Sequence, residues 1–149
     1  MAVTHYPYVS FIQRQFNGNA FDWDAVALKV SAHSSTYVPD REVHDFQNDL
    51  SGELTDSTDW PAGGVALNAR TVTYDSATRQ VRLLGGSQIS VANVQLTAIR
   101  YFVVYNSTPG TAATNPLVSL IDLGQNENVD GTLSITWDAT GVGRFVLPA

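Results

Sequence analysis

Three histidines and two pairs of aspartates are the residues of this chain whose types could support catalysis or metal binding. His5, His33 and His44 lie far apart along the sequence. No two of them have the spacing by which neighbouring histidines on one helix hold a metal ion. We therefore interpret each histidine as a surface or packing residue.

Paired carboxylates can act as general acid and general base, and Asp22 with Asp24 and Asp56 with Asp59 are such pairs. Both pairs fall in turn-rich sequence, where solvated aspartates are far more common than catalytic ones. The stretch 126–131 resembles the opening of a calcium-binding loop, but a tryptophan occupies the position of its closing glutamate. The sequence therefore predicts a protein that is not an enzyme and that holds no metal and no cofactor.

Exposed tryptophans on a β-sandwich can bind sugars by stacking, so the three tryptophans require a separate interpretation. Trp23 and Trp60 lie in turn-rich sequence and are expected to be exposed, whereas Trp137 ends a strand pattern and is expected in the core. A carbohydrate-binding β-sandwich therefore remains an alternative function.

Composition excludes other classes of partner. The chain has 149 residues, which fits one domain, and it has no cysteine, so disulfides and thiolate chemistry are impossible. A net charge of −6, with one lysine and scattered arginines, is unlike a nucleic-acid-binding protein. No apolar run approaches the roughly 20 residues that span a bilayer, and we expect no membrane partner and no export signal.

The hydrophobic pattern predicts a mainly all-β fold, an antiparallel β-sandwich that is jelly-roll-like or immunoglobulin-like. Residues 95–105 are apolar on both faces and are expected to form the central strand. One short helix is predicted at about residues 40–50, because Asp40 can cap it and apolar residues recur at helical spacing. Residues 1–16 are expected to form an N-terminal arm or a first strand, and residues 17–149 a single β-sandwich domain. The other strands are expected at residues 25–32, 65–74, 80–84, 88–91, 117–123, 132–137 and 144–147.

Two charged residues interrupt otherwise apolar strand patterns, Arg100 in 95–105 and Asp122 in 117–123. An unpaired charge buried in a sheet costs roughly several kcal/mol. We therefore predict an ion pair between Arg100 and Asp122. The alternative is that each side chain reaches solvent separately at a sheet edge.

Several sequence blocks, in this order and at these intervals, resemble small virion structural proteins of tailed bacteriophages, a group that includes capsid decoration (cement) proteins. The resemblance extends over most of the chain from about residue 24. The blocks are Leu28-Lys-Val30, Tyr37-Val-Pro-Asp40, His44-Asp-Phe46, Ala62-Gly-Gly64 with Leu67, Thr71-Val-Thr-Tyr-Asp75, Ala98-Ile-Arg-Tyr-Phe-Val-Val-Tyr105, Gly110-Thr-Ala-Ala-Thr-Asn-Pro-Leu117, Ile121-Asp-Leu-Gly124 and Gly131-Thr-Leu-Ser-Ile-Thr-Trp137.

This resemblance implies a capsid decoration protein, assembled in the host cytoplasm, that binds the phage major capsid protein on the outside of the head, often as a homotrimer at a symmetry axis. A tail or neck component is the alternative within the same class. Two segments are expected to contact the capsid or neighbouring subunits, the aromatic N-terminal segment and the loop 107–116. The expected contact residues are Tyr6, Tyr8, Phe11, Phe16, Thr108 and Pro109.

Overall fold

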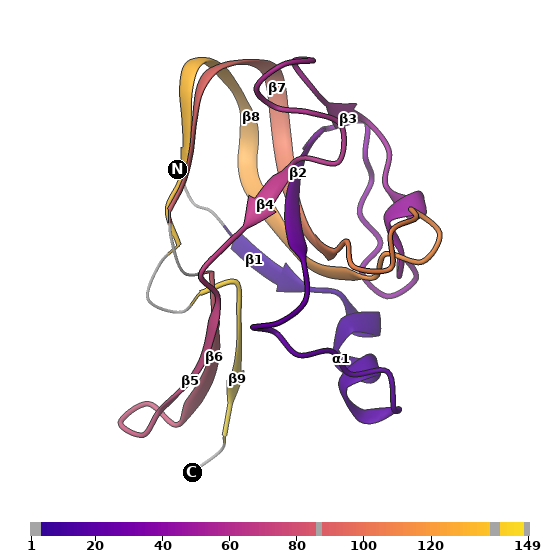
Figure 1. The fold of residues 1–149 in the computed structure, drawn as a ribbon, viewed down its shortest axis with the longest axis vertical. Coiled ribbons are helices and arrows are strands. Elements are labelled where there is room, and N and C mark those ends of the chain that lie inside the picture. Colours follow the sequence, from indigo (N-terminus) through magenta and orange to yellow (C-terminus); the bar gives the residue numbers. More distant parts are fainter. Residues whose placement is uncertain (1–3, 86–87, 138–140, 148–149) are drawn as a thin grey trace.

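The computed structural model describes residues 4–85, 88–137 and 141–147, and in this part of the chain the fold is an antiparallel all-β sandwich (Figure 1). The predicted fold class is confirmed. Residues 1–3 of the predicted N-terminal segment lie outside the described residues. The elements are β1 (Thr4–Pro7), α1 (Val9–Phe16), β2 (Leu28–Ser34), the 3₁₀ helix η1 (Gln47–Asp49), β3 (Glu53–Leu54), β4 (Val65–Leu67), β5 (Thr71–Asp75), β6 (Gln80–Leu84), β7 (Ile89–Asn106), β8 (Leu117–Ile135) and β9 (Gly143–Val146).

The strands form two antiparallel sheets. The larger has the order β1-β8-β7-β2-β3, with β4 also paired to β2, and the smaller has the order β5-β6-β9. β1 pairs with β8 in the register Thr4↔Asp122 to Pro7↔Ser119, so the N-terminal segment begins as an edge strand of the larger sheet. One hydrophobic core joins the sheets, because Leu83 of β6 packs in the same cluster as side chains of β2, β7 and β8.

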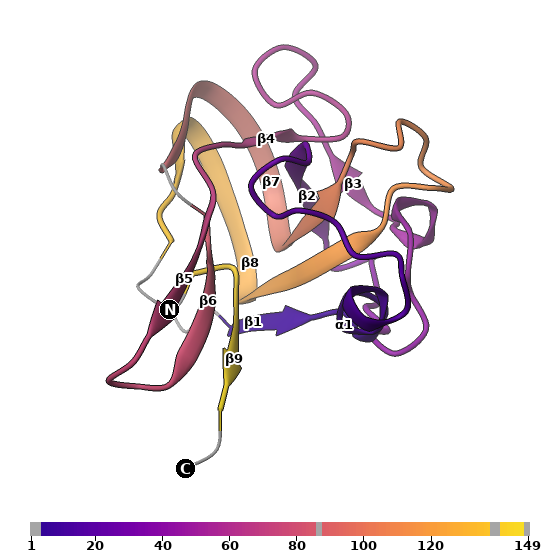
Figure 2. The same ribbon diagram turned by 60° about the horizontal axis from the view of Figure 1, so that its bottom comes forward.

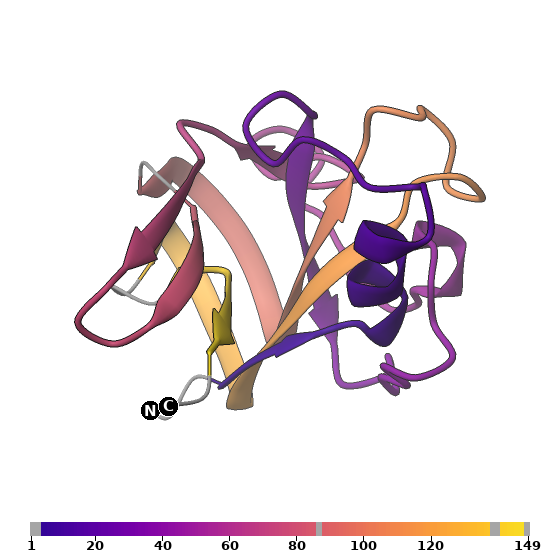
Figure 3. The ribbon, with the colours of Figure 1, turned by 90° about the horizontal axis from the view of Figure 1, so that it is seen from below.

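Strands β7 and β8 form one long, strongly bent ribbon that curls around one side of the molecule (Figure 3). The sequence pattern predicts four shorter strands in this region, separated by turns near Asn93 and at residues 124–131 and by the loop 107–116. Those positions are irregularities within continuous strands: the register shifts between Val91 and Val94, and Gly124 has φ +79°. Glycine and asparagine tolerate positive φ in bulges as well as in turns, so their presence did not identify chain reversals here.

The α-helix predicted at about residues 40–50 is wrong, and the only α-helix in the described residues is α1. Asp40 does accept hydrogen bonds from the backbone N–H groups of Glu42 and Val43, so the capping signal forms a single turn. The chain then becomes extended at Phe46, with φ −128° and ψ 164°, where it bridges to Pro116. The isolated bridge replaces further helical turns, and the 3₁₀ helix η1 follows it.

Strand β2 carries a buried histidine, and its two ring nitrogens are both occupied. His33 is 2% exposed; Nδ1 lies 2.8 Å from the carbonyl oxygen of Ser51 and Nε2 lies 2.8 Å from Oγ of Ser31. The carbonyl can only accept, so Nδ1 carries the proton in the neutral ring. Burial is the main cause that lowers the pKa of His33 below its usual 6.5, partly opposed by the hydrogen bond to Ser51 and by Glu53.

This lowered pKa predicts that the fold loses stability between pH 7 and pH 5. Below about pH 6.5 the unfolded chain binds a proton at His33 that the folded protein does not bind, so the free energy of unfolding falls with pH. The measurement is the melting temperature of the wild type and of His33→Asn, which retains a donor for Ser51, at half-unit steps across this range. The variant should have a shallower pH dependence, and a slope equal to that of the wild type would contradict the assignment.

Candidate interaction surface

The N-terminal segment is anchored in the protein by its aromatic side chains. Tyr8 is fully buried, and its hydroxyl lies 2.9 Å from the hydroxyl of Tyr37, which in turn lies 3.0 Å from Nδ1 of His44. Burial raises the pKa of Tyr8 far above its usual value. Phe11 is 5% exposed, and its ring centroid lies 5.6 Å from that of Phe21. Tyr8 and Phe11, both expected to contact a partner, therefore belong to the chain's own core.

Helix α1 is joined to the loop 37–46 by backbone and cation–π contacts. The N–H of Val9 donates to the carbonyl oxygen of Arg41 at 3.0 Å. The guanidinium of Arg41 lies 4.4 Å from the ring centroid of Tyr6, and that of Arg14 lies 4.6 Å from the ring centroid of Phe46. Figure 2 shows α1 beside the segment that connects β2 with β3. The two segments are therefore in direct contact.

These two segments carry four exposed apolar side chains, Val9, Phe16, Val38 and Val43, and we call this set the N-terminal surface. Phe16, at the end of α1, is 83% exposed, and Val38 and Val43 are 77% and 71% exposed. Large apolar side chains left exposed on well-anchored segments are a feature of surfaces that bind another protein. Of the four N-terminal aromatic residues predicted to contact a partner, only Phe16 is highly exposed, and Tyr6 is half-buried under Arg41.

The second predicted contact segment, the loop 107–116, is held close to the sheet at its base. Oγ1 of Thr108 accepts a hydrogen bond of 2.8 Å from the N–H of Ala27, and the N–H of Ser107 donates to the carbonyl oxygen of Ala27. Thr108 and Pro109 are both exposed. The loop is therefore fixed at its base to the segment before β2. The hydroxyl oxygen of Thr108 is already used as a hydrogen-bond acceptor within the chain.

No family model, no curated protein and no solved structure matches this chain.

Arg100 and Asp122 are joined in the structure. Nη2 of Arg100 lies 3.0 Å from Oδ1 of Asp122, and Nη1 donates to the carbonyl oxygen of Gly124. The two side chains are 25% and 27% exposed. An ion pair with this solvent access contributes on the order of 1 kcal/mol or less to the stability of the fold. Its main effect is local, because Arg100 contacts both Asp122 and the backbone of Gly124.

The tryptophans differ from their expected positions. Trp23 and Trp60, expected to be exposed, are 5% and 0% exposed, and that prediction is wrong. Both belong to the main core, where Trp60 makes an edge-to-face contact with Phe102 at a centroid distance of 6.0 Å. Trp137, expected in the core, is half-buried. The two side chains on which the carbohydrate-binding alternative depended are therefore not available for stacking on a sugar.

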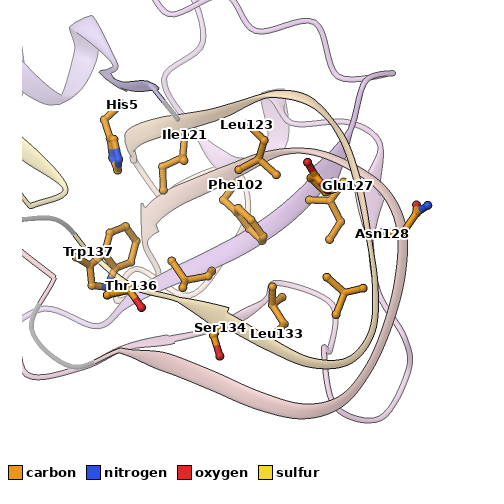
Figure 4. A pocket seen from close by; sticks show the side chains of 13 residues that line it. His5, Phe102, Ile121, Leu123, Glu127, Asn128, Leu133, Ser134, Thr136 and Trp137 are labelled. Atoms are coloured by element: carbon orange, nitrogen blue, oxygen red, sulfur yellow. The ribbon is translucent and has the colours of Figure 1, made fainter. Parts of the chain in front are cut away.

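The bent ribbon lines a mainly apolar cavity of about 440 Å³ that is partly open to solvent, shown in Figure 4. Phe102, Ile121, Leu123 and Leu133 line it from β7 and β8, and Trp137 lies at one end near His5. The ring of Trp137 also covers Gly85, where an added Cβ would lie 2.5 Å from the indole. The cavity is large enough for an apolar side chain or a small apolar ligand, but its lining identifies neither.

No helix in the described residues is long and apolar enough to cross a bilayer. No three histidine, aspartate or glutamate side chains within the same residues lie close enough together to hold a metal ion.

The sequence did not indicate that Val38 and Val43 are exposed, or that Arg70 joins two backbone segments. The helix predicted at about residues 40–50 has Val43 on its apolar face, and the pattern gives no role to Val38, which precedes that helix; both are exposed on the loop that the structure shows there. Arg70 donates to the backbone carbonyls of Trp23, Asp24, Val26 and Leu67, and it thereby fastens the segment before β2 to the end of β4. Nothing in the local sequence indicates this role, because the acceptors are backbone atoms.

Proposed function

We propose that the protein is a structural component of a tailed-phage virion, a capsid decoration protein that binds the assembled major-capsid lattice and has no catalytic role. The sequence blocks described above support the virion class. The structural observation that carries the proposal is the N-terminal surface, where Phe16, Val38 and Val43 are exposed on segments fixed to the core. An apolar surface of this kind is stabilised by burial against a partner.

The physical role of such a protein follows from mass action. A protein that binds the assembled lattice, and not the free capsid subunit, stabilises the lattice by its free energy of binding. Many copies bound side by side therefore strengthen the shell, even where each individual contact is weak. A net charge of −6 keeps the free protein soluble at the concentrations that full occupancy requires.

The test is binding of the purified protein to undecorated phage heads, measured by co-sedimentation and imaged by cryo-electron microscopy beside purified tails. We expect regular density on the outside of the head. Three copies around a three-fold axis would establish the homotrimer that the resemblance implies. Density confined to the tail or neck, at low copy number, would overturn the decoration role and favour the alternative virion location.

Phe16→Ser should weaken binding to heads about 10- to 100-fold, because burying a phenylalanine side chain contributes about 1.5–3 kcal/mol. The melting temperature should hardly change, since Phe16 is 83% exposed. Val146→Ser is the control variant: Val146 is 59% exposed but lies on β9, in the other sheet. Equal binding by Phe16→Ser and wild type would show that the N-terminal surface does not contact the head.

A further inference from the structure

Strand β5 is an open edge of the smaller sheet. It lies at the end of the order β5-β6-β9 and forms the outer strand of a hairpin that projects from the molecule (Figures 1 and 2). Residues 71–74 are all exposed, so both faces of the strand are accessible as well as its edge. An edge strand in this position offers unpaired backbone N–H and C=O groups to another strand.

One face of the smaller sheet is apolar and only partly covered. Paired residues of antiparallel strands share a face, and the register Val72↔Leu83 and Tyr74↔Val81 places these four side chains together. Phe145 of β9 joins them through its pairing with Val81. Val72 and Tyr74 are 47% and 58% exposed, so the apolar face is least covered along β5.

The edge lacks the features that usually prevent strands from pairing between molecules. β5 contains no proline, no lysine and no irregularity in its pairing with β6. Its one charged side chain, Asp75, is neutralised within the chain by Arg82, with Nη2 and Oδ2 2.6 Å apart. A second strand can therefore approach this edge without meeting an unpaired charge on β5.

We propose that β5 pairs antiparallel with β5 of a second copy of this chain, around a two-fold axis at Thr73, to form a continuous six-stranded sheet. In this register Thr73 faces Thr73 of the second copy, and Val72 faces Tyr74 of the second copy. Thr71 faces Asp75 of the second copy. This inference does not rest on the proposed location in the virion.

The sequence of β5 favours a second copy as the occupant because it is complementary to itself in this register. Each apolar pair joins an aromatic and a β-branched side chain, and the central pair joins two threonines, which are favourable cross-strand pairs. No like charges face each other across the new edge. The two copies of Arg144, on the outer strands β9, would be separated by five strand spacings, about 24 Å, which is well beyond the screening length of roughly 8–10 Å.

The absence of cysteine from the chain allows a direct test by disulfide trapping. In the proposed register the two Cα atoms of residue 73 lie about 4.5–5.5 Å apart, within the range that a disulfide spans. Residue 71 is the matched control: it is also an exposed threonine of β5, but its two copies would be offset by four residues, about 14 Å. Thr73→Cys should give covalent dimers in most chains under mild oxidation, and Thr71→Cys in at most about a tenth as many.

Sedimentation equilibrium of the full-length wild type should show a dimer or an even-numbered assembly. Thr73→Lys should weaken its association at least about 100-fold, because two lysines would then face each other at the axis. Circular dichroism and the melting temperature of each variant verify that it is folded. Equal yields of disulfide-linked dimer from Thr71→Cys and Thr73→Cys would overturn the proposal. A wild type that is only monomeric or only trimeric would also overturn it, and the partner of the β5 edge would then be a strand of another protein.

Discussion

Replacing Trp60 with alanine should lower the free energy of unfolding by about 3–5 kcal/mol, the range observed for removing a large aromatic side chain from a core. Trp60 is completely buried, and its indole packs edge-to-face on Phe102 in the C-terminal part of β7. For a domain of this size the loss corresponds to a fall in melting temperature on the order of 10 °C, measurable by thermal or urea denaturation.

Two further variants make the Trp60 result interpretable. Trp60→Phe keeps an aromatic ring against Phe102 and should cost clearly less than alanine. Trp137→Ala removes the same type of side chain from a half-buried site at the rim of the cavity, and should also cost less. A Trp60→Ala protein as stable as wild type would show that the indole is not part of the packed core.

Gly64→Ala should be the most damaging single-methyl substitution in the described part of the chain. Gly64 has φ +71°, and a Cβ there would overlap the carbonyl group of Val30, with Cα of Ser31 only 2.7 Å away. All of these atoms are backbone atoms of β2, so relief requires β2 and the segment before β4 to separate. We expect a loss of about 3 kcal/mol or more, seen as a reduced midpoint of urea denaturation.

Gly18→Ala is the matched control for the Gly64 variant. Gly18 has a similar positive φ of +84°, but a Cβ there would have no atom within 4 Å. Its cost should therefore be the conformational penalty alone, about 1 kcal/mol. Similar losses for the two variants would contradict the close approach of Gly64 to β2 and would attribute both effects to the backbone angle.

The fold class was predictable from the sequence because alternation of apolar and polar residues depends on local geometry. The stretch 95–105 is apolar on both faces, and it forms the C-terminal part of β7, which lies in the middle of the larger sheet between β8 and β2. The limits of the strands were less predictable. The sequence predicts turns at Gly124 and Asn93, but the pairing of β7 with β8 continues past both of them, and long-range pairing of this kind leaves no local signal.

The position of the helix and the exposure of the aromatic residues depended on tertiary contacts that the sequence does not display. The pattern of Val43, Phe46 and Leu50 fits helical spacing, yet the bridge between Phe46 and Pro116 makes the chain extended. Tyr8 is buried in a cluster with Tyr37 and side chains of β7 and β8, and Phe11 is buried in the main core beside Phe21. The pairing of Arg100 and Asp122 was easier to anticipate, since two charges in adjacent apolar strands have few other partners.

The pairing of β1 with β8 constrains the order of events during synthesis. Thr4 is opposite Asp122, so β1 leaves the ribosome long before β8, the strand with which it pairs, has been made. Until then Tyr8 and Phe11 lack part of the core that covers them, and the nascent chain exposes aromatic side chains. Folding dominated by such distant contacts is slow. We therefore expect the newly made protein to depend on chaperones, or on low temperature during expression, more than its final stability would suggest.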